Sequence, residues 1–136
     1  MPRYMLDTDT CSYIIRRSSD ALLKRLRNVP VNDVCISVMT KAELLYGVEV
    51  SPRSAQDRMA LNAFLQYLDV LDFTDEASFH YAQIRAQLKT VGRMIGANDL
   101  FIAAHAQSLG LTLVTNNTRE FGRVSNLKCE NWVTHN

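Results

Sequence analysis

The sequence predicts an α/β domain in which helices flank a central parallel sheet. Short apolar runs alternate with longer segments in which apolar residues recur every three or four positions. Hydrophobic residues make up 47% of the 136 residues and charged residues 21%, as in ordinary globular domains. No internal repeat, low-complexity tract or linker divides the chain, so we expect one domain over residues 1–136.

Four short runs have the composition of buried strands. They occupy residues 3–6, 34–36, 70–73 and 111–114. Each run is brief, rich in β-branched or aromatic residues and bounded by polar residues. Because helical segments separate consecutive runs, the strands are expected to pair in parallel through helical crossovers.

Three helices are expected before the third strand. Ser19 and Pro30 bracket the first, as a polar start and a stop. Ser37 can cap the second, which follows the second strand directly. Residues 55–68 are expected to form the third, with these apolar side chains at helical spacing: Met59, Ala63, Phe64 and Leu68.

Two more helices are expected between the third and fourth strands. Thr74 starts one that runs to about residue 90 and carries Phe79, Ile84 and Leu88. Asn98 and Asp99 are expected to cap the other. Gly110 closes it, because glycine readily adopts the left-handed conformation that commonly ends a helix.

Acidic residues stand at those ends of the predicted elements that meet at one edge of a parallel sheet. Asp7 closes the first strand, Glu43 lies early in the helix after the second, and Asp99 starts the helix before the fourth. Glu120 follows the fourth strand in a turn. Since ligands of such sheets bind at this edge, we expect these acids to converge there, with two neighbours beside them: Asp9 and Asn117.

Carboxylates gathered at one site repel each other, and each raises the pKa of its neighbours. Such a cluster usually persists because a divalent cation neutralises it. Oxygen ligands without a nearby Cys or His suit Mg²⁺ or Mn²⁺ better than zinc. The cluster therefore predicts a metal site that can activate water for attack on a phosphodiester without a side-chain nucleophile.

Four segments resemble, in order, the successive motifs of PIN-domain ribonucleases. They are MLDTDT at residues 5–10, the run from Ile36-Ser37 to Glu43-Leu44, GANDLFIAAHA at residues 96–106 and VTNNTREF at residues 114–121. The greatest similarity is to the VapC toxins of bacterial type II toxin–antitoxin systems. The resemblance extends from Met5 to about Trp132 and implies a PIN-like domain.

This resemblance implies roles for the acids. Asp7, Glu43 and Asp99 would bind one or two Mg²⁺ ions, for which Mn²⁺ can substitute, and Glu120 would complete the catalytic set. Many members have Asp where this chain has Asn117, so the second metal position departs from the family pattern. Three residues are expected to surround the ligands without binding the metal: Asp9, Thr115 and Asn117.

The resemblance also implies an activity and partners. We expect an endoribonuclease toxin that cuts RNA, with the anticodon loop of initiator tRNA as the expected target. A small VapB-type antitoxin would neutralise it, and the toxin would form a homodimer. Because removal of one like charge relieves repulsion among the acids, replacement of Asp7, Glu43 or Asp99 by Ala is expected to abolish cleavage and leave the fold intact.

The formal charge is only +1, from 15 Lys and Arg against 14 Asp and Glu. This balance excludes a uniformly basic surface but leaves room for local basic patches that bind phosphates. The candidate RNA-binding residues are Arg16, Arg17, Arg85, Lys89 and Arg93.

Two alternatives stay open. The segment LDTDT at residues 6–10 also fits phosphatases of the haloacid dehalogenase type, in which Asp7 would be the nucleophile and Asp9 the acid–base. In that case Glu43 would have no role. The other alternative is a catalytically silent PIN-like binding module, which the missing carboxylate at Asn117 favours.

The sequence also bears on the compartment. Its three cysteines are far apart and form no CxxC pair, so we expect free thiols, with Cys11 and Cys35 buried. The N-terminus lacks the apolar region of a signal peptide, and no run of about 18 apolar residues predicts a membrane span. We therefore expect a soluble, cytoplasmic protein.

Overall fold

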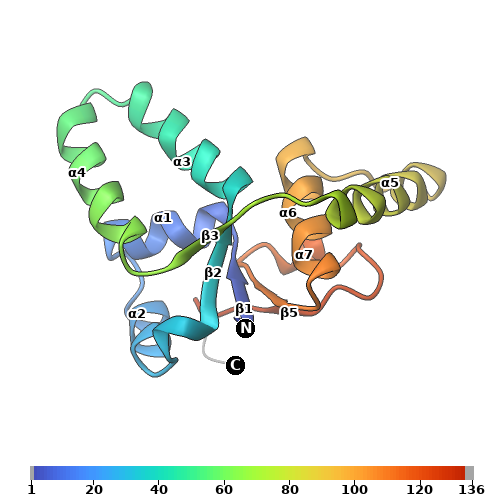
Figure 1. Ribbon diagram of the computed structural model, residues 1–136, viewed down its shortest axis with the longest axis horizontal. Coiled ribbons are helices and arrows are strands. Elements are labelled where there is room, and N and C mark those ends of the chain that lie inside the picture. Colours follow the sequence, from blue (N-terminus) through green and yellow to red (C-terminus); the bar gives the residue numbers. More distant parts are fainter. Residues whose placement is uncertain (1, 134–136) are drawn as a thin grey trace.

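The computed structural model describes residues 2–133 and has a central five-stranded sheet in the order β3-β2-β1-β4-β5 (Figure 1). Every pair of neighbouring strands is parallel. The strands are β1 Tyr4–Leu6, β2 Val34–Ser37, β3 Asp69–Leu71, β4 Thr112–Val114 and β5 Cys129–Glu130. The predicted α/β class with a parallel sheet is confirmed.

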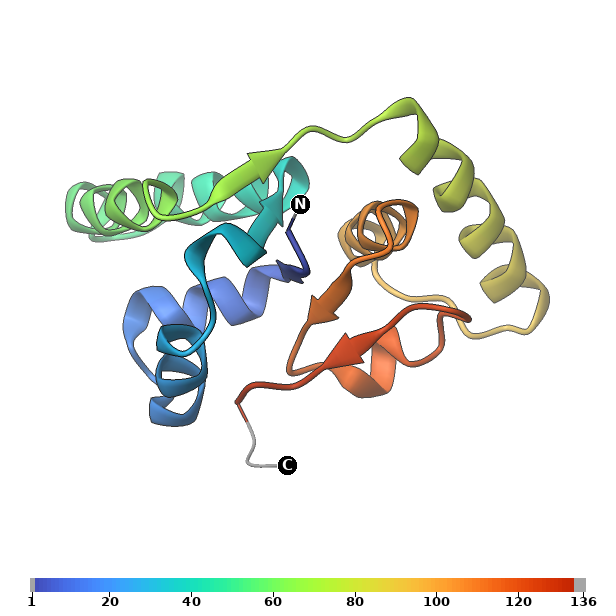
Figure 2. The same ribbon diagram turned by 60° about the horizontal axis from the view of Figure 1, so that its bottom comes forward.

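Helices cover both faces of the sheet. In Figure 2, α1 to α4 lie on one side of the strands, and α5 and α6 lie on the other. The helices are α1 Thr8–Arg16, α2 Asp20–Arg27, the 3₁₀ helix Val31–Asp33, α3 Val38–Glu49, α4 Ser54–Leu65, α5 Asp75–Thr90, α6 Ala97–Ser108 and α7 Thr118–Phe121.

All four predicted strands and all five predicted helices are present, with ends shifted by a few residues. Four elements were not predicted, and one of them is the short 3₁₀ helix Val31–Asp33. α1 has the sequence TDTCSYIIR, whose Thr, Cys and Ile residues have low helix propensity. α7 and β5 have four and two residues, which is too short for a periodic pattern.

The predicted helix starts are mostly confirmed. Ser19, Ser37 and Thr74 each cap a helix through a side-chain oxygen that accepts a backbone N–H. The prediction for α6 was wrong, because Gly96 is its N-cap and both Asn98 and Asp99 lie in its first turn. At the other end, Gly110 has the predicted left-handed conformation, with φ +67°.

The core consists of two apolar clusters, one on each face of the sheet. Met5 and Leu113 belong to the cluster under α5 and α6, whereas Leu6 and Val114 belong to the cluster under α1 to α4. This alternation follows from the two-residue period of a strand. The alternation fixes the register of β1 in the sheet, and Asp7 follows at the carboxyl end of the strand.

Three predicted helix-face residues lie outside the core, namely Met59, Ala63 and Phe79. The side chain of Met59 is 74% exposed and that of Phe79 is 62% exposed. Cys11 and Cys35 are free and buried, as predicted. Among the described residues, no helix has the length and apolar character needed to cross a membrane.

Candidate active site

The predicted acids lie where the carboxyl ends of β1 and β4 meet the N-terminal ends of α1, α6 and α7. Asp7 directly follows β1 and is the N-cap of α1. Thr115 and Asn117 follow β4, and Asn117 is the N-cap of α7. This is the edge at which parallel α/β sheets bind ligands.

Asp7 is the most rigidly held of the acids, with an exposed fraction of 3%. Its Oδ1 accepts the backbone N–H of Thr10 at 2.9 Å, and its Oδ2 accepts the hydroxyl of Thr115 at 2.6 Å. Burial raises the pKa of Asp7, although these hydrogen bonds oppose the shift. The carboxylate therefore has a fixed orientation and an unfavourable environment for its charge.

Glu43 links three helices at the same edge. Its Oε1 accepts the hydroxyl of Thr8 at 2.6 Å, and its Oε2 accepts the side-chain amide of Asn98 at 3.0 Å. Thr8 begins α1, and Asn98 lies in the first turn of α6. Glu43 is thereby positioned from α3 by neutral donors, with no cation paired to it among residues 2–133.

Glu120 is held by neutral groups on both of its oxygens. The backbone N–H of Gly96 donates to Oε1 at 2.9 Å, and the amide of Asn117 donates to Oε2 at 2.7 Å. Burial alone would raise the pKa of Glu120, but these hydrogen bonds, that with Asp99 and the charge of Arg123 lower it. Glu120 is therefore ionised at neutral pH.

Asp99 lies beside Glu120. A Cβ added at Gly96 would lie 3.5 Å from Oδ2 of Asp99 and 3.8 Å from Oε1 of Glu120, so both carboxyl groups lie next to Gly96. Burial raises the pKa of Asp99 to about 7, and its contact with Glu120 and the charges of Glu120, Asp7 and Glu43 add to the shift. In the metal-free protein, Asp99 therefore holds a proton part of the time near neutral pH.

The acids do not form a complete set of metal ligands in this side-chain arrangement. Within residues 2–133, no three Asp, Glu, His or Cys side chains converge into a group that could hold a metal ion as they stand. Glu43 and Glu120 are instead occupied by uncharged donors. Their all-oxygen chemistry fits a hard cation.

Two other predicted residues, Thr115 and Asp9, lie near Asp7 at this edge. Thr115 bonds Asp7 and also accepts the backbone N–H of Asn117 at 2.9 Å. Asp9 is exposed in the first turn of α1, and its charge raises the pKa of Asp7. Five predicted RNA-binding residues are exposed, on α1 and its C-cap or on α5 and the loop after it: Arg16, Arg17, Arg85, Lys89 and Arg93.

Sequence reasoning missed three supporting residues, namely Thr8, Thr10 and Gly96. Thr8 and Thr10 alternate with the two acids of the first motif, and Gly96 opens the third. Their position inside the motifs was the available signal. Their hydrogen bonds, however, join elements up to 104 residues apart, as in the bond from Thr10 to the carbonyl of Val114.

Comparison with known proteins identifies the family. The PIN domain profile matches residues 4–127. The chain is 44% identical over 133 residues to "Ribonuclease VapC2" of Haemophilus influenzae, which covers 98% of this chain and 100% of the relative. It is 42% identical to "tRNA(fMet)-specific endonuclease VapC" of Shigella flexneri, over 97% of this chain and 99% of the relative.

Solved structures agree. VapBC2 from Rickettsia felis, bound to a DNA fragment from its promoter, aligns with a TM-score of 0.90 at 42% identity and covers 95% of this chain and 98% of the other. DNA-bound VapBC from Salmonella typhimurium aligns with a TM-score of 0.92 at 39% identity, over 97% and 99%. With the family profile matched across most of its length, the chain belongs to the PIN-domain family, among the VapC ribonucleases.

Proposed function

We propose that this protein is the toxin of a VapBC system and a metal-dependent endoribonuclease that cuts tRNA. The names of its relatives support RNA cleavage, and the Shigella flexneri relative is named for tRNA(fMet). The observation that carries the metal requirement is that four acids gather at one edge of the sheet, where the charges of Glu120, Asp7 and Glu43 all oppose ionisation of Asp99. The proposed cation is Mg²⁺, with Mn²⁺ as a substitute.

In this mechanism, Asp7, Glu43 and Asp99 bind the metal, which supplies neutralisation of phosphate charge and activation of a water molecule. Thr10 and Thr115 fix the orientation of Asp7 through the two hydrogen bonds at its oxygens. Glu120 stays ionised because Gly96 and Asn117 donate to it. It can therefore accept a proton from the attacking water.

The direct test is incubation of the purified, antitoxin-free protein with total cellular tRNA and Mg²⁺ or Mn²⁺, with cut sites mapped by primer extension. We expect discrete cuts in one tRNA, in the anticodon loop of initiator tRNA. EDTA should abolish the cuts. Cleavage that continues in EDTA would refute the metal requirement, and a folded protein that cuts no RNA would favour the silent binding module.

The phosphatase alternative is not favoured. The chain belongs to the PIN-domain family rather than to a phosphatase family. Glu43, which has no role in the phosphatase, lies at the same edge of the sheet as Asp7 and accepts the hydroxyl of Thr8, the residue after Asp7.

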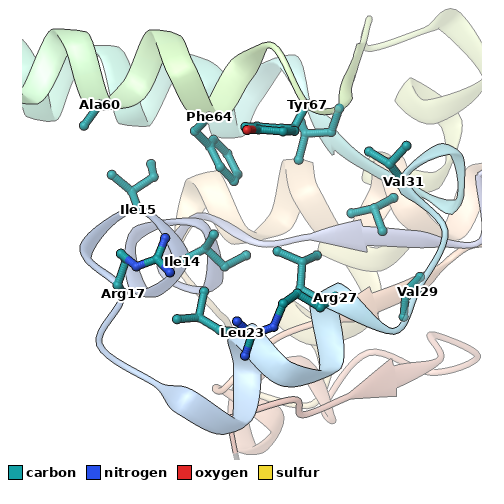
Figure 3. A pocket seen from close by; sticks show the side chains of 13 residues that line it. Ile14, Ile15, Arg17, Leu23, Arg27, Val29, Val31, Ala60, Phe64 and Tyr67 are labelled. Carbon is teal, nitrogen blue, oxygen red and sulfur yellow. The ribbon is translucent and has the colours of Figure 1, made fainter.

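We also propose a VapB-type antitoxin as the partner, because the structural neighbours are VapBC complexes. An apolar groove of about 620 Å³ between α1, α2 and α4 suits this partner. Figure 3 shows the side chains that line the groove. Ile15, Leu23 and Phe64 give the groove an apolar lining. Arg17 and Arg27 also line it and add positive charge. We expect an apolar antitoxin segment with nearby acidic residues to occupy it. The homodimer and the cytoplasmic location stay predictions.

Replacing Ala60 by Arg should block this groove. Ala60 is exposed on α4 and lines the groove, so an arginine side chain there would fill space that the antitoxin needs. Ala60 is not one of the active-site residues, so the substitution should leave the acids unchanged. We expect at least about a tenfold loss of antitoxin affinity with tRNA cleavage unchanged. Asn62→Arg, on the same helix but away from the groove, is the matched control. Unaltered inhibition of Ala60→Arg by the antitoxin would place the partner elsewhere.

A further inference from the structure

A second cavity, of about 390 Å³, opens between α1, α3 and α4 directly beside the acidic cluster. Thr8 and Glu43, which are hydrogen-bonded to each other, form the end nearest the cluster. Of the residues that line the groove of Figure 3, only Ile15 also lines this cavity. A polymer held with one phosphodiester at the acids would therefore enter this cavity with a neighbouring unit.

The cavity has both an apolar surface and positively charged side chains, the two features that suit a nucleotide. Leu44, Val48 and Leu61 provide an apolar surface for a base or ribose. Arg16 and Arg53 provide positive charge for a phosphate. Both arginines are exposed at the cavity mouth.

The charge of Arg16 is not used by the protein itself. Its Nε donates to the backbone carbonyl of Ser12 at 3.3 Å, and it forms no ion pair within residues 2–133. Arg53 contacts Asp57 at 3.5 Å, but the stronger bond of that carboxylate is with the hydroxyl of Ser51 at 2.5 Å. Within residues 2–133, Arg16 is therefore the arginine of this cavity that no carboxylate pairs with.

Gly47 is an independent sign of a ligand. It lines the cavity from the interior of α3, where glycine is the least favourable residue apart from proline. A Cβ added there would meet no atom of the described residues within 4 Å, and its φ is not positive. Within residues 2–133, neither packing nor backbone conformation requires glycine at this position, whereas close approach of a bound molecule would require it.

We propose that this cavity is an RNA subsite that binds one nucleotide flanking the scissile phosphate. Arg16 contacts a phosphate of the RNA, the apolar wall receives a base or ribose, and the RNA backbone passes over Gly47. This proposal rests on the proposed ribonuclease function. RNA is favoured over a protein ligand because the cavity is continuous with the acids that would hold the scissile phosphate.

The test compares Gly47→Leu with wild type on a short RNA that contains the mapped cut site. We expect kcat/KM to fall at least about tenfold, because the added side chain fills the subsite. Removing the nucleotides on one side of the cut should lower kcat/KM for wild type by a similar factor. The same truncation should then have little effect on Gly47→Leu, since variant and truncation remove the same contact.

Three variants keep the result interpretable. Gly47→Ala should fold with an equal or higher melting temperature, because Ala is the better helix former. Asn62→Leu adds an exposed leucine to α4 away from both cavities and should cleave like wild type. Arg16→Gln should reduce the slope of log kcat/KM against log salt by about 0.7, the value for one phosphate contact to a single strand.

The outcomes are separable. Wild type that cuts no RNA would overturn the proposed function, whereas active wild type with equally active, folded Gly47→Leu would overturn the subsite alone. Gly47→Leu that cleaves normally but escapes antitoxin inhibition would assign the cavity to the protein partner and refute the RNA subsite. If Gly47→Leu fails to fold, an unchanged salt slope for Arg16→Gln would still refute it.

Discussion

Replacement of Asp99 by Asn is expected to abolish RNA cleavage and, at the same time, to stabilise the metal-free protein. The loss of activity should reach about a thousandfold or more, since a metal ligand contributes several kcal/mol to transition-state stabilisation. The gain in stability arises because burial and the neighbouring charge of Glu120 oppose ionisation of Asp99. A residue that served only the fold would lose activity and stability together.

The raised pKa of Asp99 determines how the free energy of unfolding changes with pH. The pKa of Asp99 is about 7 in the folded protein against an ordinary value of 3.8. Between these values the folded state binds more protons than the unfolded state, so stability falls as pH rises through this window. Above pH 7 the full penalty applies, which we place at about 1–2 kcal/mol after allowing for the partial exposure of Asp99.

Urea denaturation in EDTA measures this effect. The free energy of unfolding of Asp99→Asn should exceed that of wild type by about 1–2 kcal/mol at pH 8, and the difference should shrink towards pH 4. Glu76→Gln, at an exposed carboxylate on α5, is the control and should change stability by less than about 0.5 kcal/mol. Lower stability of Asp99→Asn than of wild type at pH 8 would contradict the burial of a charge at this position.

The sequence predicted the edge at which the acids lie because that placement depends on topology alone. Asp7 ends β1 and Asp99 lies in the first turn of α6, and Glu43 lies further along α3, the helix that starts at the carboxyl end of β2. N-caps such as Ser37 were predictable for a similar reason, since the capping bond to Met39 spans two residues. Signals of this kind are local, and a sequence shows them directly.

The partners of the acids were not predictable in this way. Asn98 donates to Glu43 across 55 positions, and Gly96 donates to Glu120 across 24. Which side chains meet at such distances depends on strand register and on helix rotation. The same limit applies to Phe79, whose helical spacing resembles that of core residues although α5 turns its side chain to the surface.

Replacement of Asp7 by Ala is expected to abolish cleavage and, unlike Asp99→Asn, to destabilise the protein. Asp7 caps α1 through the backbone N–H of Thr10, and loss of such a cap costs about 1 kcal/mol. It also accepts the hydroxyl of Thr115, which is fully buried and would lose its acceptor at a further cost of about 1–3 kcal/mol. Removal of a buried carboxylate, whose pKa is raised by burial, offsets part of this loss.

We therefore expect Asp7→Ala to lower the free energy of unfolding by about 2–3 kcal/mol at pH 7. This differs from the expectation, drawn from charge repulsion alone, that all three acids can be replaced without harm to the fold.

Asp7→Asn separates the two roles. The side-chain oxygen of Asn at position 7 can still accept the backbone N–H of Thr10. The hydroxyl of Thr115, which donates to Asp7 in wild type, would keep its bond from the backbone N–H of Asn117 but lose the group to which it donates. The Asn variant should thus be inactive yet lose only about 1 kcal/mol. Denaturant titrations of both variants, with cleavage measured in the same preparations, check the order. Equal stability of Asp7→Ala and wild type would show that the cap and the Thr115 bond contribute nothing net, and would leave charge repulsion as the dominant effect at Asp7.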